Sequence, residues 1–88
     1  MKAVIAAYAR SPFHPSRKGK LAEVRPDDLG AQVVQGLMRR TGLDPELLDD
    51  VILGCAYPES AQGNNLARIV GLLAGLPQEV GGMTVNRF

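Results

Sequence analysis

Three segments decide the fold, namely residues 51–56 (VILGCA), 64–73 (NNLARIVGLL) and 83–88 (MTVNRF). The first piece is short and apolar throughout, which is typical of a parallel strand covered on both faces. In the second, apolar side chains recur at the i, i+3, i+4, i+7 spacing of one helix face, after an asparagine that can cap the helix. The third follows a Gly-Gly turn and reads as another strand. This order predicts two parallel strands joined by a right-handed helical crossover.

The N-terminal half repeats the same organisation. Residues 3–9 (AVIAAYA) predict a further strand covered on both faces, and residues 10–25 form a loop rich in cations and prolines. Pro26, Asp27 and Asp28 signal a helix start with a carboxylate available to cap free N–H groups, and the helix continues to about Thr41. Gly42 is the expected left-handed cap. The complete order, β-α-β-α-β, predicts the α/β class with a parallel sheet.

Right-handed crossovers that step the same way place both helices on one face of the sheet. The strands are apolar on both faces, so the other face is expected to lie bare. The pattern therefore predicts that residues 1–88 cannot complete their own core and form part of a larger α/β domain.

Composition excludes several classes of function. The net charge of +1 favours neither nucleic acid nor an acidic membrane as a partner, and no apolar stretch is long enough to span a bilayer. The single cysteine, Cys55, and the single histidine, His14, exclude a disulfide framework and a metal centre. Cys55 is expected to pack as a small apolar side chain in its strand, and His14 to lie exposed in its loop. The charged N-terminus followed at once by a strand predicts no signal peptide and a cytoplasmic location.

Several short motifs together resemble the thiolase family. They are GNNLAR at residues 63–68, AGLP at 74–77 and TVNRF at 84–88, which are similar to that family's G-x-N-x-A-R, a-G-l-P and V-N-x-x-C patterns. AVIAAYARSP at residues 3–12 and VILG at 51–54 resemble its first two strands. The resemblance covers essentially the whole chain. It implies that residues 1–88 are the N-terminal segment of a thiolase N-terminal domain. They would form the first β-α-β-α-β part of a thiolase-fold half-domain, whose parallel, mixed-sheet layers are incomplete in this chain.

The resemblance also implies an activity, that of an acetyl-CoA acyltransferase (3-ketoacyl-CoA thiolase). The family's reactive cysteine is expected directly after Phe88, at a helix N-terminus that favours the thiolate, so no catalytic residue lies within the chain. The reaction would convert a 3-oxoacyl-CoA and CoA into acetyl-CoA and a shortened acyl-CoA through a cysteine acyl-enzyme, in fatty-acid β-oxidation. CoA and acyl-CoA are substrates, and no cofactor or metal is expected. Residues 85–88 and Leu66 favour this degradative branch.

Two alternatives stay open. One is a biosynthetic thiolase that forms acetoacetyl-CoA, and another is a non-catalytic, truncated fragment that only binds or dimerises. The segment by itself is expected to be inactive, whether a longer polypeptide continues past Phe88 or the chain is a true truncation. The basic loop at residues 10–25 is expected to be a solvated surface, with a contact to the phosphates of CoA as the alternative.

The residues expected to support the active site and a dimer interface are Gln62, Asn65, Arg68, Asn86 and Arg87. Asn86 and Arg87 stand next to the expected nucleophile, and a structural hydrogen bond is favoured for Asn86 over direct chemistry. Arg68 lies on the small-residue side of its helix, where a long cation can hold carbonyls of a neighbouring loop or else lie on a plain surface helix. The complete enzyme is expected to be a homodimer or homotetramer.

Overall fold

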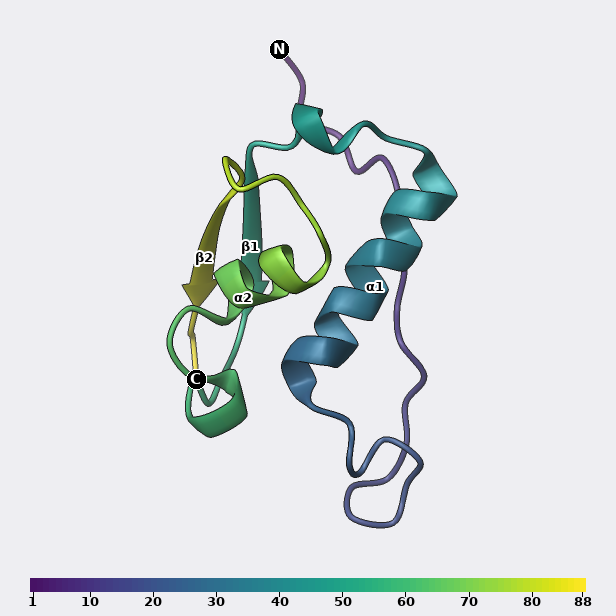
Figure 1. The fold of residues 1–88 in the computed structure, drawn as a ribbon, viewed down its shortest axis with the longest axis vertical. Coiled ribbons are helices and arrows are strands. Elements are labelled where there is room, and N and C mark those ends of the chain that lie inside the picture. The colour runs from purple at the N-terminus through teal and green to yellow at the C-terminus, as the bar shows by residue number, and fades with distance from the viewer.

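The computed structural model describes all residues from Met1 to Phe88. Its elements are, in chain order, helix α1 (Pro26–Thr41), the 3₁₀ turn η1 (Pro45–Leu47), strand β1 (Asp50–Gly54), the 3₁₀ turn η2 (Ser60–Gln62), helix α2 (Leu66–Leu73) and strand β2 (Gly81–Val85). Figure 1 shows α2 across the two strands, with α1 to one side and the N-terminal segment running along α1.

The β-α-β unit predicted for the C-terminal half is confirmed. β1 and β2 pair in parallel, in a register that runs from Asp50 opposite Gly81 to Gly54 opposite Val85. The N–H of Cys55 donates to the carbonyl of Val85 over 2.9 Å, which extends the ladder by one bond. Both strands begin and end earlier than predicted. β2 stops at Val85 because the next asparagine takes the N–H of Phe88 into a local turn.

The predicted helix ends are also confirmed. Gly42 adopts a left-handed conformation (φ 66°), and its N–H donates to the carbonyl of Met38. At the start of α1, the carboxylate of Asp27 accepts the free N–H of Asp28 over 2.8 Å. The guanidinium of Arg25 donates two further hydrogen bonds to the same carboxylate, at 3.1 and 3.0 Å. These bonds hold the pKa of Asp27 below its usual value of 3.8 although burial acts in the opposite direction, and they raise the pKa of Arg25.

The core is small and centred on α2. Its buried apolar side chains are Ala31, Leu66, Ala67, Val70, Leu76 and Val80. α1 packs on α2 rather than on the sheet, and the approach is close at Gly30, where an added Cβ would lie 3.1 Å from Val70 Cγ2. Neither helix has the length and apolar character that a membrane span requires.

The strand predicted for residues 3–9 is wrong for this structure. These residues form no ladder, and Val4 and Ile5 are 80% and 93% exposed. Their firmest contact is the hydrogen bond from Arg40 Nη1 to the carbonyl of Tyr8, at 2.9 Å. An apolar segment becomes a strand only when it pairs with a sheet edge, and this segment lies along α1 instead, although β1 and β2 each leave one edge unpaired.

One face of the sheet lies bare, as predicted. Val51 and Leu53 face α2 and are half-buried, whereas Ile52 on the opposite face is 62% exposed. Met83 and Val85 continue this exposed face along β2. A two-stranded sheet with a single covered face has little independent stability.

We therefore expect residues 1–88 alone to unfold over a broad temperature range and to bind a hydrophobic dye in the cold, because so little apolar surface is buried. Circular dichroism and dye fluorescence measure both properties. The matched control is Ile52→Lys, which should change the free energy of unfolding by less than about 0.5 kcal/mol because this side chain is already exposed. A sharp, cooperative transition of the unmodified chain would contradict the prediction.

Candidate functional site

The start of α2 is joined to β2 by a set of polar contacts that we call the α2–β2 junction, consisting of Asn65, Ala67, Gly82 and Thr84. Asn65 is the N-cap of α2, and its Oδ1 accepts from the N–H of Arg68 at 3.3 Å and from Thr84 Oγ1 at 2.8 Å. Its Nδ2 donates to the carbonyl of Gly82 at 2.8 Å. Thr84 Oγ1 in turn accepts from the N–H of Ala67 at 3.0 Å. Both polar atoms of the Asn65 side chain therefore have partners, and the Thr84 hydroxyl both donates and accepts a hydrogen bond.

These contacts satisfy helix groups that have no partner within the helix. The first N–H groups of any α-helix lack an intrahelical acceptor, and Ala67 is completely buried. Leaving its N–H without a partner would cost on the order of 1–3 kcal/mol. Thr84 is therefore a second cap of α2, supplied by the strand rather than by the helix.

The backbones of α2 and β2 approach each other most closely at Gly82. A Cβ added there would lie 2.6 Å from the backbone nitrogen of Arg68 and 3.1 Å from the carbonyl carbon of Ala67. Both are backbone atoms, so no side-chain rotation could relieve the overlap. The position requires glycine because of this close approach.

Arg68 contacts the loop that leads into β2. Its side chain is half-buried, and Nη1 donates to the carbonyl of Val80 at 2.7 Å. Val80 is buried and directly precedes β2. Arg68 therefore fixes the entry of the chain into β2 from within the same chain.

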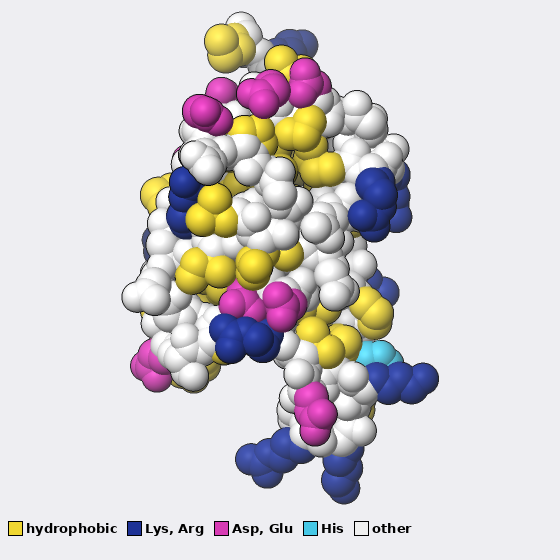
Figure 2. All heavy atoms as spheres, viewed as in Figure 1, with side chains coloured by type: hydrophobic (Ala, Val, Ile, Leu, Met, Phe, Trp, Pro, Cys, Tyr) yellow, Lys and Arg dark blue, Asp and Glu magenta, His cyan; other side chains and the backbone are white.

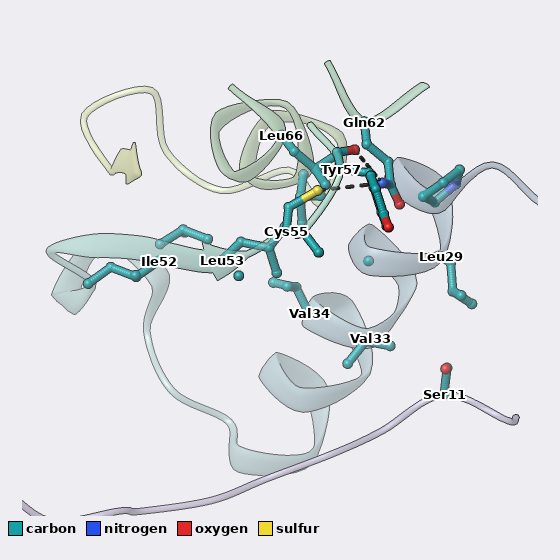
Figure 3. Close-up of a pocket in the computed structure, with 16 residues that line it drawn as sticks. Ser11, Leu29, Val33, Val34, Ile52, Leu53, Cys55, Tyr57, Gln62 and Leu66 are labelled. Atoms are coloured by element: carbon teal, nitrogen blue, oxygen red, sulfur yellow. Dashed lines mark hydrogen bonds between the residues drawn. The ribbon is translucent and has the colours of Figure 1, made fainter. Parts of the chain in front are cut away.

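Gln62 organises the loop that follows β1 (Figure 3). Its Nε2 donates to the carbonyl of Tyr57 at 2.8 Å and to the sulfur of Cys55 at 3.4 Å. The ring of Tyr57 lies 5.0 Å from that of Phe88, with the two planes inclined by 58°. This tilted aromatic contact brings the loop against the chain beyond β2.

Asn86 and Arg87 lie on the exposed segment beyond β2. Asn86 Oδ1 accepts from the N–H of Phe88 at 2.9 Å, which is a local hydrogen bond. An asparagine oxygen that accepts from the N–H two residues later is also the arrangement of a helix N-cap. Arg87 makes no hydrogen bond or ion pair, and the structure does not bring it to the other predicted residues.

Three residues with a structural role here were not singled out from the sequence, namely Thr84, Gly82 and Tyr57. Alternation along β2 places Gly82 and Thr84 on one face, and a polar residue on a covered face indicates a hydrogen-bond partner. That signal was available. Nothing in the pattern indicated that the ring of Tyr57 would meet Phe88.

A hollow of about 640 Å³ lies between α1 and β1 (Figure 3). Its lining is mostly apolar and includes Leu29, Val33 and Val34 of α1. Cys55 is half-buried at its rim, with the Gln62 amide on its sulfur, and has no base beside it. The hollow is therefore best described as a gap in apolar packing between α1 and β1, without catalytic groups.

Figure 2 shows Lys and Arg side chains that project into solvent from the far end of the loop at residues 10–25. Arg17, Lys18 and Lys20 are exposed on a turn closed by the N–H of Gly19 donating to the carbonyl of Pro15. Only Arg25 is paired with a carboxylate. No group of three or more His, Cys, Asp or Glu side chains in the structure could hold a metal ion.

Comparison with known proteins supplies the context for this geometry. The family model for the thiolase N-terminal domain matches residues 3–88. The chain is 52% identical over 87 residues to a 3-ketoacyl-CoA thiolase of Bacillus subtilis (strain 168), which covers 99% of this chain and 22% of that protein. It is 47% identical over 86 residues to a protein of the same name from Saccharophagus degradans, and the match covers 97% of this chain and 22% of that protein. The chain spans about a fifth of the length of these curated relatives.

The close approach at Gly82 can be tested by the substitution Gly82→Ala. We expect a loss of about 2–3 kcal/mol in the free energy of unfolding, because two backbones must separate to admit the methyl group. Denaturant titration followed by circular dichroism measures this free energy.

The matched control is Gly36→Ala in the middle of α1, where an added Cβ meets no atom within 4 Å. This change should stabilise the protein by roughly 0.5–1 kcal/mol, since alanine loses less backbone freedom in a helix. Equal effects of the two substitutions would show that the α2–β2 approach is not constrained.

Proposed function

Because the chain belongs to the thiolase family, we propose that the protein containing it is an acetyl-CoA acyltransferase that cleaves 3-oxoacyl-CoA with CoA. The observation that carries this proposal is the identity of 52% and 47%, across nearly the whole chain, to relatives that bear the name 3-ketoacyl-CoA thiolase. Degradation of fatty acids by β-oxidation is the process in which we place it.

The proposed reaction has two steps. A cysteine thiolate attacks the 3-oxo carbonyl of the substrate, the bond between C2 and C3 breaks, and acetyl-CoA leaves after its C2 carbon takes up a proton. The acyl group is then on the cysteine sulfur. The sulfur of CoA, after loss of its proton to a base, attacks this thioester, and the shortened acyl-CoA leaves as the cysteine thiolate is restored.

We place the cysteine directly after Phe88. β2 and the Asn86 turn would then carry it, and the N-cap arrangement of Asn86 supports a helix that begins at Arg87. The next positions would lie in the first turn of that helix, where the helix dipole lowers the pKa of a thiol. The proton donor and the base of the reaction would come from other parts of the protein.

The supporting residues divide into two groups under this proposal. Asn65 and Arg68 hold β2 and its entry, and Gln62 holds the loop whose Tyr57 contacts Phe88. Arg87 is exposed and free of partners, so it is the residue best placed to meet a second subunit. We propose a homodimer or homotetramer in which this end of the sheet faces the partner.

The proposal is tested by the intact mass of the complete protein before and after incubation with acetyl-CoA. We expect the mass to rise by one acetyl group, because the cysteine thiolate displaces CoA from the thioester. Substituting alanine for the residue directly after Phe88 should abolish the increase. The matched control, Cys55→Ala, should retain it, since Cys55 packs at the end of β1.

Substrate preference separates the remaining alternatives. Thiolysis of 3-oxoacyl-CoA substrates of several chain lengths is expected, and turnover of acetoacetyl-CoA alone would favour the biosynthetic thiolase. A complete protein that neither takes up an acetyl group nor cleaves any 3-oxoacyl-CoA would contradict the proposal and favour a non-catalytic role.

A further inference from the structure

We propose that Thr84 is a positioning residue for the reactive cysteine, acting through the direction in which the chain leaves β2. This inference rests on the proposed function, and it assigns a role to a side chain that was not among the expected site residues. Thr84 would not touch substrate. It would hold the strand that carries the nucleophile.

The first observation is that Thr84 is bonded on both sides of its hydroxyl group. Oγ1 donates to Asn65 Oδ1 at 2.8 Å and accepts from the N–H of Ala67 at 3.0 Å. A hydroxyl can do both, whereas a methyl group can do neither. The strand is thus fixed relative to the first turn of α2 both along its axis and in rotation.

The second observation is that this contact lies just before the strand ends. Val85, the next residue, is the last of β2, and its carbonyl accepts from the N–H of Cys55. Beyond it the chain is held only by the Asn86 turn and by the ring of Phe88 against Tyr57. Thr84 is therefore the last residue before the expected nucleophile whose side chain is anchored to a helix.

The third observation is that the junction cannot readily compensate for a lost hydroxyl. Gly82, two residues earlier on the same face, already lies against the backbone of Arg68 and Ala67. The strand can move toward α2 no further. A valine at position 84 would leave the N–H of Ala67 unpaired, and relief would come by the strand end moving away from the helix.

Such a movement would be expressed in the chemistry. A misplacement of a reacting group by about 1 Å can cost on the order of 100-fold in rate. A cysteine carried on a displaced strand end would also lose alignment with the helix start that stabilises its thiolate. Substrate binding, which depends on other parts of the protein, would change much less.

The test uses Thr84→Val, Thr84→Ser and the control Thr41→Val in the complete enzyme. For Thr84→Val we expect kcat for thiolysis to fall roughly 10- to 100-fold, with KM changed by less than about threefold. The pH profile of cysteine alkylation by iodoacetamide should shift to higher pH. Thr84→Ser, which keeps the hydroxyl, should restore kcat to within about threefold of the unaltered enzyme.

Thr41→Val makes the same chemical change at the exposed end of α1, where the hydroxyl bonds only to carbonyls of its own helix and to the N–H of Leu43. Its kcat and alkylation profile should equal those of the unaltered enzyme. If Thr84→Val fails to fold, Thr84→Ala replaces it, because alanine also removes both hydrogen bonds of the hydroxyl and the same loss of kcat is expected without a branched apolar group at this position.

The outcomes are separable from those of the proposed function. Active unaltered enzyme with a folded Thr84→Val or Thr84→Ala variant of normal kcat and normal alkylation profile would overturn the positioning role alone. A lower melting temperature without a change in either kinetic measurement would do the same, since it would indicate a purely structural role. Absence of any thiolase activity in the unaltered enzyme would overturn the proposed function, and the positioning role with it.

Discussion

Hydrogen bonds from Asn65 and Thr84 close the first turn of α2 against β2, and the remaining packing follows from where they hold the helix. Once α2 is fixed across the strands, Ala67 and Val70 become the centre of the core. α1 then packs on α2 through the close contact at Gly30. A two-stranded sheet has little stability of its own, so this polar closure gives the β-α-β unit a defined geometry.

The sequence predicted those parts of the fold that depend on neighbouring residues in the chain, such as helix caps and apolar strands. One of the two adjacent asparagines, Asn65, caps α2, Gly42 takes the left-handed conformation, and the apolar run at residues 51–56 pairs as a parallel strand. The run at residues 3–9 is also apolar and forms no strand. The difference is the neighbour, because apolar pattern describes what a segment can bury and not which edge is available to it.

The expected site residues make contacts within the chain. Asn65 and Arg68 lie in the GNNLAR motif and Gln62 directly precedes it, and each has a specific hydrogen-bond partner. Their support of an active site and a dimer interface stays a prediction. The identity of those partners depends on tertiary contacts at sequence separations that no local pattern encodes. Thr84 shows the limit most clearly. Alternation along β2 gives its face, but only the fold reveals that the opposing groups are the start of α2.

Hydrogen bonding of buried polar groups is complete in this segment, whereas burial of its apolar side chains is not. No buried side-chain nitrogen or oxygen lacks a hydrogen-bond partner, whereas Ile52 and Met83 leave an apolar sheet face exposed. Hydrogen bonds determine geometry over a few ångströms, and apolar burial supplies most of the folding free energy. The direction of the chain beyond β2 is therefore set by contacts within residues 55–88, while the exposed sheet face leaves the burial of apolar surface incomplete. A substitution at Thr84 should accordingly alter the placement of the following residues more than the stability of the whole protein.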